Sequence, residues 1–237
     1  METLLKLMLL EMRKHRFAGY IGGAGIANVA ILLFLILIGF ADKGAEDYPF
    51  GSYEGSFMII DTFTRATFII FAGALISKLI ISEYKNKTMN VMFTYPIKRH
   101  KIIAVKLMIV FIFTFVMIMF SNLLMGAILI TTDHFYSFIP EALSIDEAWR
   151  LLVKYTISSL SAAGMALIPL FFGMRKHSVT TTMVSSMLLV LVVCSGFNGN
   201  GSELSIHSLI VIPLTLGAIG LWIASLSMVR LETKDVN

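Results

Sequence analysis

The sequence contains little of what enzymes use for covalent or redox chemistry. It has one cysteine and five histidines in 237 residues. Because Cys194 is the single cysteine, an intramolecular disulfide and a cysteine-based metal cluster are both excluded. Only 14% of the residues are charged, whereas soluble domains average about a quarter. The chain is therefore not an ordinary soluble domain.

Nucleotide-binding, protease and haem motifs are absent as well. The sequence has no Gly-x-x-x-x-Gly-Lys-Ser/Thr phosphate loop with which to bind ATP, and no His-Glu-x-x-His zinc motif. Its histidines lie in loops or at the ends of apolar runs, where they cannot ligate a haem between membrane spans. We expect a chain that is not an enzyme and binds no cofactor itself.

Apolar residues, by contrast, make up 57% of the sequence. A membrane-spanning helix needs about 20 mostly apolar residues, and runs of that length without alternation favour helices over barrel strands. We expect an all-α integral membrane protein that forms a single transmembrane domain over residues 1–237. Its six expected spans are residues 17–40, 57–82, 102–132, 151–174, 178–199 and 208–229.

The charges between these runs indicate an orientation. Lysines and arginines cluster in the N-terminal arm, the second loop, the fourth loop and the tail, whereas acidic residues dominate the other loops. The positive-inside rule then predicts a multi-pass protein of the cell membrane with both termini in the cytoplasm. Residues 1–16 mix leucines with charges and predict a helix at the inner membrane interface. Since the net charge of +4 arises from these short clusters, we expect no nucleic-acid partner.

The second cytoplasmic loop, residues 83–101, contains a predicted short helix of its own. Thr88 can cap this helix, and Pro96 disfavours helical backbone in the residue before it, so the helix would end near Tyr95. Its apolar surface includes Met89, Met92 and Phe93. These side chains need a partner protein or the bilayer to cover them, and the pattern alone does not decide between the two.

The same loop resembles the loop after the second span of exporter-type ABC transporter permeases (ABC type 2). The shared pattern is Glu-Tyr-Lys-x-x-Thr, an apolar stretch, and then Thr-x-Pro-Ile-x-Arg-x-Lys-Ile-Ile-x-x-Lys. Lys87 departs from it, because a glycine is expected there. The residues that carry the resemblance are Glu83, Tyr84, Lys85, Thr88, Thr94, Pro96, Ile97, Arg99, Lys101, Ile102, Ile103 and Lys106.

This resemblance implies that the loop is a coupling helix that docks on a separate ABC ATPase subunit, in two copies, which carries the ATP and Mg²⁺. The second permease would be identical or related, and the membrane a bacterial plasma membrane. The expected function is ATP-driven export of amphipathic or antimicrobial peptides or similar hydrophobic substrates. The expected ATPase-coupling residues are Glu83, Thr88, Met89, Met92, Phe93, Pro96 and Arg99.

Asp61 and Arg65 are opposite charges four residues apart within an expected span, so they share one helix face and can neutralise each other. They lie roughly 6 and 12 Å along the helix from Phe57. The pair is either structural or part of a substrate path. An ion channel or ion-coupled secondary transporter that uses this pair is the alternative function. Lys78, Lys106 and Lys154 lie near span ends and are expected to extend to the membrane interface.

Two further patterns predict local structure. Ser144 and Glu147 have the spacing of a capping box, which predicts a helix that begins near Ile145. Small residues from Ser158 to Gly164, and Gly19 with Gly23, predict close helix packing.

Overall fold

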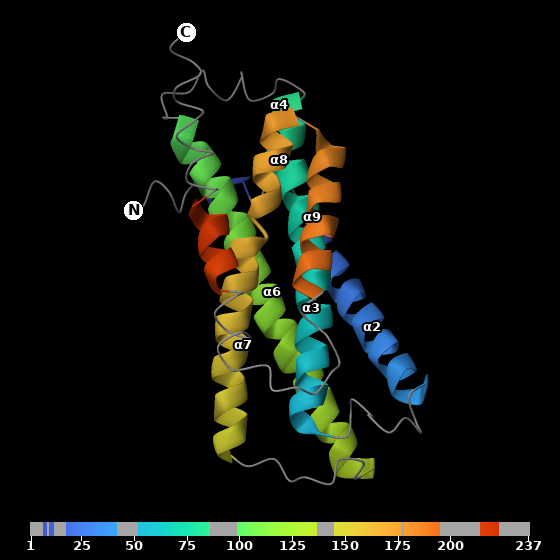
Figure 1. Cartoon of the computed structure of the whole chain (residues 1–237). Helices are drawn as coiled ribbons and strands as arrows, with labels where there is room; N and C mark the ends of the chain where they lie inside the picture. The colour runs from blue at the N-terminus through green and yellow to red at the C-terminus, as the bar shows by residue number, and fades with distance from the viewer. Residues whose placement is uncertain are drawn as a thin grey trace.

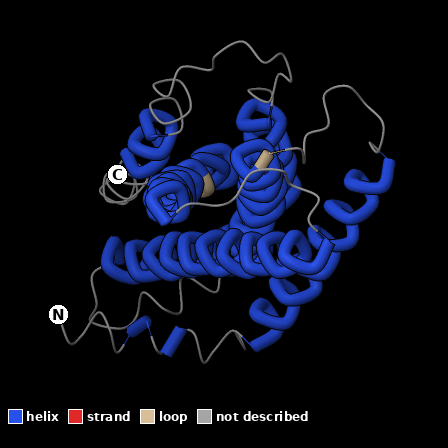
Figure 2. Tube along the Cα trace, turned by 90° about the horizontal axis from the view of Figure 1, so that it is seen from below, coloured by secondary structure: helices blue, strands red, loops and turns tan. Residues whose placement is uncertain are grey.

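The computed structural model is a bundle of helices. It describes residues 7–8, 10–11, 18–41, 52–85, 99–136, 145–176, 178–194 and 214–222. These residues contain no strand, and the few that are not helical lie at helix ends or breaks (Figure 2). The expectation of an all-helical membrane protein is confirmed for this part of the chain.

Most helices run roughly along one common direction (Figure 1). The second long helix consists of three pieces without a gap, namely α3, the π-helix η1 and α4. The elements are α2 (Ala18–Ala41), α3 (Tyr53–Ile76), η1 (Ser77–Ile81), α4 (Ser82–Lys85), α6 (Arg99–Tyr136), α7 (Ile145–Met165), α8 (Ile168–Lys176) and α9 (Val179–Cys194), with one further helix at residues 214–222.

Four of these helical stretches are long and apolar enough to cross a membrane: Gly19–Ile38, Tyr53–Tyr84, Ile102–Phe135 and Ile145–Lys176. The expected spans 178–199 and 208–229 coincide with the shorter apolar helix α9 and with the helix at residues 214–222. The count of six spans therefore stays a prediction. The expected interfacial helix, residues 1–16, lies mostly outside the described residues.

Local sequence signals explain where the helices begin and break. Ser52 caps α3 by accepting a hydrogen bond from the Gly55 N–H, at 3.2 Å. The helix α7 begins at Ile145, as the capping-box spacing predicts. Pro169 lacks an N–H and its ring disfavours helical backbone before it, which explains the two-residue turn between α7 and α8.

The helix α3 occupies the centre of the bundle and packs against α6, α7 and α9 (Figure 1). Small residues bring neighbouring helices close together, because a Cβ added at Gly73 would lie 2.7 Å from the Ser186 Cβ of α9. Similarly, a Cβ at Gly164 of α7 would lie 2.6 Å from the Gly217 carbonyl oxygen. The predicted packing role of the small residues in α7 is confirmed at this contact.

In contrast, α2 packs against the bundle through one narrow stripe. Its buried positions recur every three or four residues, as expected for a helix with one covered face. Gly23 approaches the Phe71 ring, whereas a Cβ at Gly19 would meet nothing within 4 Å. The buried residues of the stripe are Ala24, Asn28, Ile31 and Leu35.

Candidate functional site

The expected coupling loop joins α4 to α6, and we call this end of the bundle the loop end. Lys85 ends α4 and Arg99 begins α6. The expected coupling residues Thr88, Met89, Met92, Phe93 and Pro96 lie outside the described residues. Glu83 is described, and its side chain is buried in the bundle.

Glu83 belongs to a closed group of charges, the Lys106 cluster, which consists of Glu11, Glu83, Lys106 and the Leu79 carbonyl. Lys106 Nζ forms an ion pair and a hydrogen bond with Glu83 Oε2. It lies 3.6 Å from Glu11 Oε2 and donates to the Leu79 carbonyl oxygen at 2.9 Å. The cluster thus connects the N-terminal segment, both ends of the loop and the π-helix.

The prediction that Lys106 extends to the membrane interface is wrong, because this side chain is 0% exposed. Two carboxylates and a carbonyl satisfy the ammonium group inside the bundle, so it has no need to reach water. The carbonyl that Lys106 binds belongs to the π-helix, in which the i to i+5 pattern replaces α-helical hydrogen bonding. Leu79, whose carbonyl accepts from Lys106, lies within it.

The other two lysines are at least partly exposed, and their extension to the membrane interface stays a prediction. Lys78 is exposed, and its Nζ lies 5.2 Å from the centroid of the Tyr20 ring on α2. Lys154 Nζ lies 3.6 Å from Glu54 Oε1, and the Glu54 side chain is 82% exposed.

A second group of polar side chains, the Asp61 cluster, lies in the middle of α3, α6 and α7 and consists of Asp61, Arg65, Asn122 and Ser158. Asp61 Oδ2 lies 3.0 Å from Arg65 Nε, so the expected pair is in contact. Asn122 Nδ2 of α6 donates to Asp61 Oδ1 at 2.8 Å. Ser158 Oγ of α7 donates to Asp61 Oδ2 at 2.8 Å and approaches Oδ1 at 3.1 Å. Three helices are thereby joined at one carboxylate.

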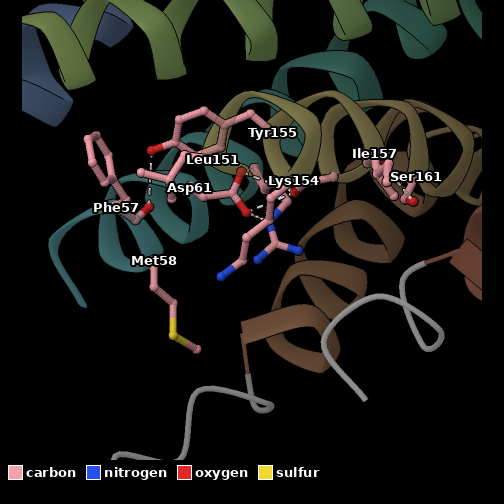
Figure 3. Close-up of a pocket in the computed structure, with 10 residues that line it drawn as sticks. Phe57, Met58, Asp61, Leu151, Lys154, Tyr155, Ile157 and Ser161 are labelled. Atoms are coloured by element: carbon pink, nitrogen blue, oxygen red, sulfur yellow. Dashed lines mark hydrogen bonds and ion pairs between the residues drawn. The ribbon is translucent and has the colours of Figure 1, made fainter. Parts of the chain in front are cut away.

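The Asp61 cluster borders a cleft between α3 and α7 (Figure 3). The cleft has a volume of about 40 Å³, enough for a few water-sized groups but not for a peptide. Figure 3 shows Asp61 of α3 and Lys154 of α7 near each other among the residues that line the cleft. Met58 and Leu151 contribute apolar surface to the cleft. The cleft is therefore basic at one point and apolar around it.

Sequence reasoning missed several members of both clusters. Asn122 follows Ser121 within an otherwise apolar stretch of α6, and an amide in a span signals an interhelical hydrogen bond. Ser158 was expected only to allow close packing. Glu11 and Lys106 are distant in sequence, and no local pattern relates them.

Comparison with known proteins agrees with this architecture. Residues 8–195 match the model of the ABC-2 family transporter protein family. The chain belongs to the ABC-2 transporter family. It is also 42% identical over 231 residues to YcbO, an uncharacterised protein of Bacillus subtilis (strain 168), and the match covers 98% of this chain and 100% of that protein. No solved structure matches the chain.

Members of the ABC-2 family are the membrane subunits of ABC transporters and normally pair with an ABC ATPase. The chain is accordingly an ABC-2 permease subunit. The matched residues include both clusters and the whole loop between α4 and α6.

Proposed function

We propose that this ABC-2 permease exports amphipathic or antimicrobial peptides or similar hydrophobic substrates, and that residues 83–101 are the site at which its ATPase docks. The loop end then faces the cytoplasm of a bacterial cell, as do both termini. Two ATPase subunits carry the ATP and Mg²⁺. A second permease, identical or related, completes the transporter.

The main support for the proposed docking site is the Lys106 cluster. Glu83 lies two residues before the end of α4, and Lys106 lies seven residues after the start of α6, so one buried ion pair joins the two ends of the loop. The two helices on either side of the loop, α4 and α6, cannot separate without breaking that pair. A displacement imposed on the loop is therefore transmitted to both helices together.

Glu11 extends this connection to the N-terminal segment. Loop, N-terminal segment, α3 and α6 would then move as one unit when the ATPase subunits close. Such rigid-body motion of packed helices is a common form of gating, and it would alter access to a path between the permeases.

The alternative, an ion channel or ion-coupled transporter that uses Asp61 and Arg65, has less support. Asp61 already accepts hydrogen bonds from Asn122 and Ser158 and pairs with Arg65. A permeating cation would have to displace these groups from the carboxylate.

Co-purification tests the proposed docking site. We expect the affinity-tagged permease, purified in mild detergent from cells that express its partners, to recover an ATPase chain and stimulated ATPase activity. The double variant Met92→Asp/Phe93→Asp should lose both, because it places two charges on the predicted apolar surface of the loop. Recovery of ATPase at the wild-type level with this variant would refute docking there.

The matched control is Asn86→Asp/Asn90→Asp, which adds two acidic groups to the same loop without removing an apolar side chain. We expect this variant to retain the ATPase. Equal loss in both double variants would mean that added charge, rather than the lost apolar contact, disrupts docking.

A further inference from the structure

The cleft between α3 and α7 has the composition of a binding site for a charged amphiphile. Its lining residues recur at helical spacing on both sides, with Asp61 and Arg65 four apart on α3 and with Lys154 and Ser158 four apart on α7. The two facing stripes therefore place charged groups against each other along a strip of apolar surface.

Asp61 is not the group that meets a ligand. It is 8% exposed, and both of its oxygens are already occupied by Asn122, Ser158 and Arg65. A cationic ligand would thus find no free carboxylate oxygen here. Asp61 instead holds Arg65 in place at the edge of the cleft.

Arg65 has more hydrogen-bond donors than its pairing with Asp61 uses. A guanidinium carries five N–H groups, and among the described residues its one ion-pair contact is between Nε and Asp61 Oδ2. Its side chain lines the cleft. The donors that do not face Asp61 are therefore available to an acceptor inside it.

Lys154 supplies a second positive charge to the same cleft. Its partner Glu54 is 82% exposed and 3.6 Å away, and exposed pairs at such distances are weak. An anion in the cleft can therefore replace Glu54 as the partner of Lys154. Because Asp61 cancels the charge of Arg65, Lys154 leaves the lining with an excess of positive charge.

We propose that this cleft binds the anionic group, carboxylate or phosphate, of a molecule with an apolar body. Arg65 and Lys154 hold the anionic group, whose size suits a volume of about 40 Å³. The apolar body lies along the surface near Met58 and Leu151. This inference rests on the proposed function where it concerns a transported substrate, whose carboxylate would occupy the cleft. The phosphate of a bilayer lipid is the other source.

Binding of dodecyl phosphate to the purified permease in phosphatidylcholine nanodiscs tests the proposal. We expect saturable binding, and a dissociation constant at least about tenfold higher in Lys154→Gln, as loss of one charge-assisted contact predicts. Lys78→Gln removes the same charge from an exposed position outside the cleft and should change the constant by less than about twofold. Equal binding by wild type and Lys154→Gln, or equal loss in Lys78→Gln, would overturn the proposal.

The role of Arg65 needs a variant that folds. Arg65→Gln alone leaves Asp61 without its cation, so the variant to compare is Asp61→Asn/Arg65→Gln, which keeps the cluster neutral. We expect this variant to lose dodecyl phosphate binding as Lys154→Gln does. Wild-type affinity in the folded double variant would overturn the role assigned to Arg65.

Repeating the measurement in nanodiscs that contain phosphatidylglycerol distinguishes the two sources. Competition by this lipid assigns the site to the bilayer, whereas unchanged affinity for dodecyl phosphate assigns it to a substrate. The assay uses the permease without its ATPase. Failure to bind alongside normal ATPase co-purification would therefore overturn this inference and leave the proposed function intact.

Discussion

The Lys106 cluster and the Asp61 cluster both place acids and bases among apolar helices, but only the first is closed. Lys106 is 0% exposed, and carboxylates from two segments and a backbone carbonyl surround its ammonium group. Arg65 of the Asp61 cluster, in contrast, lines a cleft and has N–H groups that do not face Asp61, and the neighbouring Lys154 has only a weak partner there. The Lys106 cluster therefore joins segments of the chain to one another, whereas the Asp61 cluster borders a cleft in which the chain can bind a ligand.

The largest loss of stability is expected when the Lys106 cluster loses its lysine. Lys106→Met leaves the buried Glu83 without its cation, and such a loss destabilises proteins by about 3–5 kcal/mol. We expect the midpoint of thermal unfolding in detergent to fall well below that of wild type. Lys78→Met is the control, since Lys78 is exposed. Equal midpoints for the two variants would refute the stabilising role of the cluster.

Asp61 comes next, because its removal strands Arg65 and two polar partners. We expect Asp61→Ala to destabilise the protein by about 2 kcal/mol, less than at Lys106 because Arg65 is partly exposed. The double variant Asp61→Ala/Arg65→Ala should be less destabilised than the single one. Thermal unfolding of the single and the double variant tests this expectation. Equal losses of stability would argue that Asp61 and Arg65 do not act as a pair.

A comparable effect is expected where α7 meets the helix at residues 214–222. A Cβ at Gly164 would lie 2.6 Å from the Gly217 carbonyl oxygen, so Gly164→Ala forces backbone apart and should cost about 1–3 kcal/mol. Gly22→Ala is the matched control, because a Cβ there meets nothing within 4 Å. If the control loses as much stability in thermal unfolding, the close contact is not the cause.

The smallest effect on stability is expected at Lys154. Glu54, the partner of Lys154, is 82% exposed and Lys154 itself is 33% exposed, so Lys154→Gln should change the free energy of unfolding by less than about 1 kcal/mol. Measuring both thermal unfolding and dodecyl phosphate binding separates a role of Lys154 in stability from its role in binding an anion. A large loss of stability would show that Lys154, like Lys106, supports the fold.

Much of the fold could be predicted from the sequence because lipid imposes simple rules on a chain. Apolar runs had to be helices, and the start of α7 at Ile145 followed from a local capping pattern. The turn before Pro169 also has a local cause, and it lies within Ile145–Lys176, one of the stretches that is long and apolar enough to cross a membrane. Apolar composition predicts that a segment lies in lipid, but it does not predict a turn within the helix.

The candidate site was less predictable because its contacts join distant residues. Asp61 and Arg65 lie on one helix, so their spacing sufficed. The hydrogen bond from Asn122 and the ion pair of Lys106 with Glu83 span 61 and 23 residues along the chain, and they depend on which helix faces cross. The position of Lys106 near a span end therefore predicted that it extends to the interface, whereas the packing of the helices surrounds it with carboxylates.

ATPase activity in the reconstituted transporter, compared between one variant of each cluster, tests whether the Lys106 cluster couples the loop to the helices. Lys106→Met/Glu83→Gln removes the ion pair between the two ends of the loop, and Asp61→Asn/Arg65→Gln removes both charges of the Asp61 cluster. We expect the first variant to lose permease-stimulated ATPase activity while its helices stay folded by circular dichroism, and we expect the second variant to keep this activity. Stimulated activity that survives in the first variant, or that falls equally in both, would contradict this coupling.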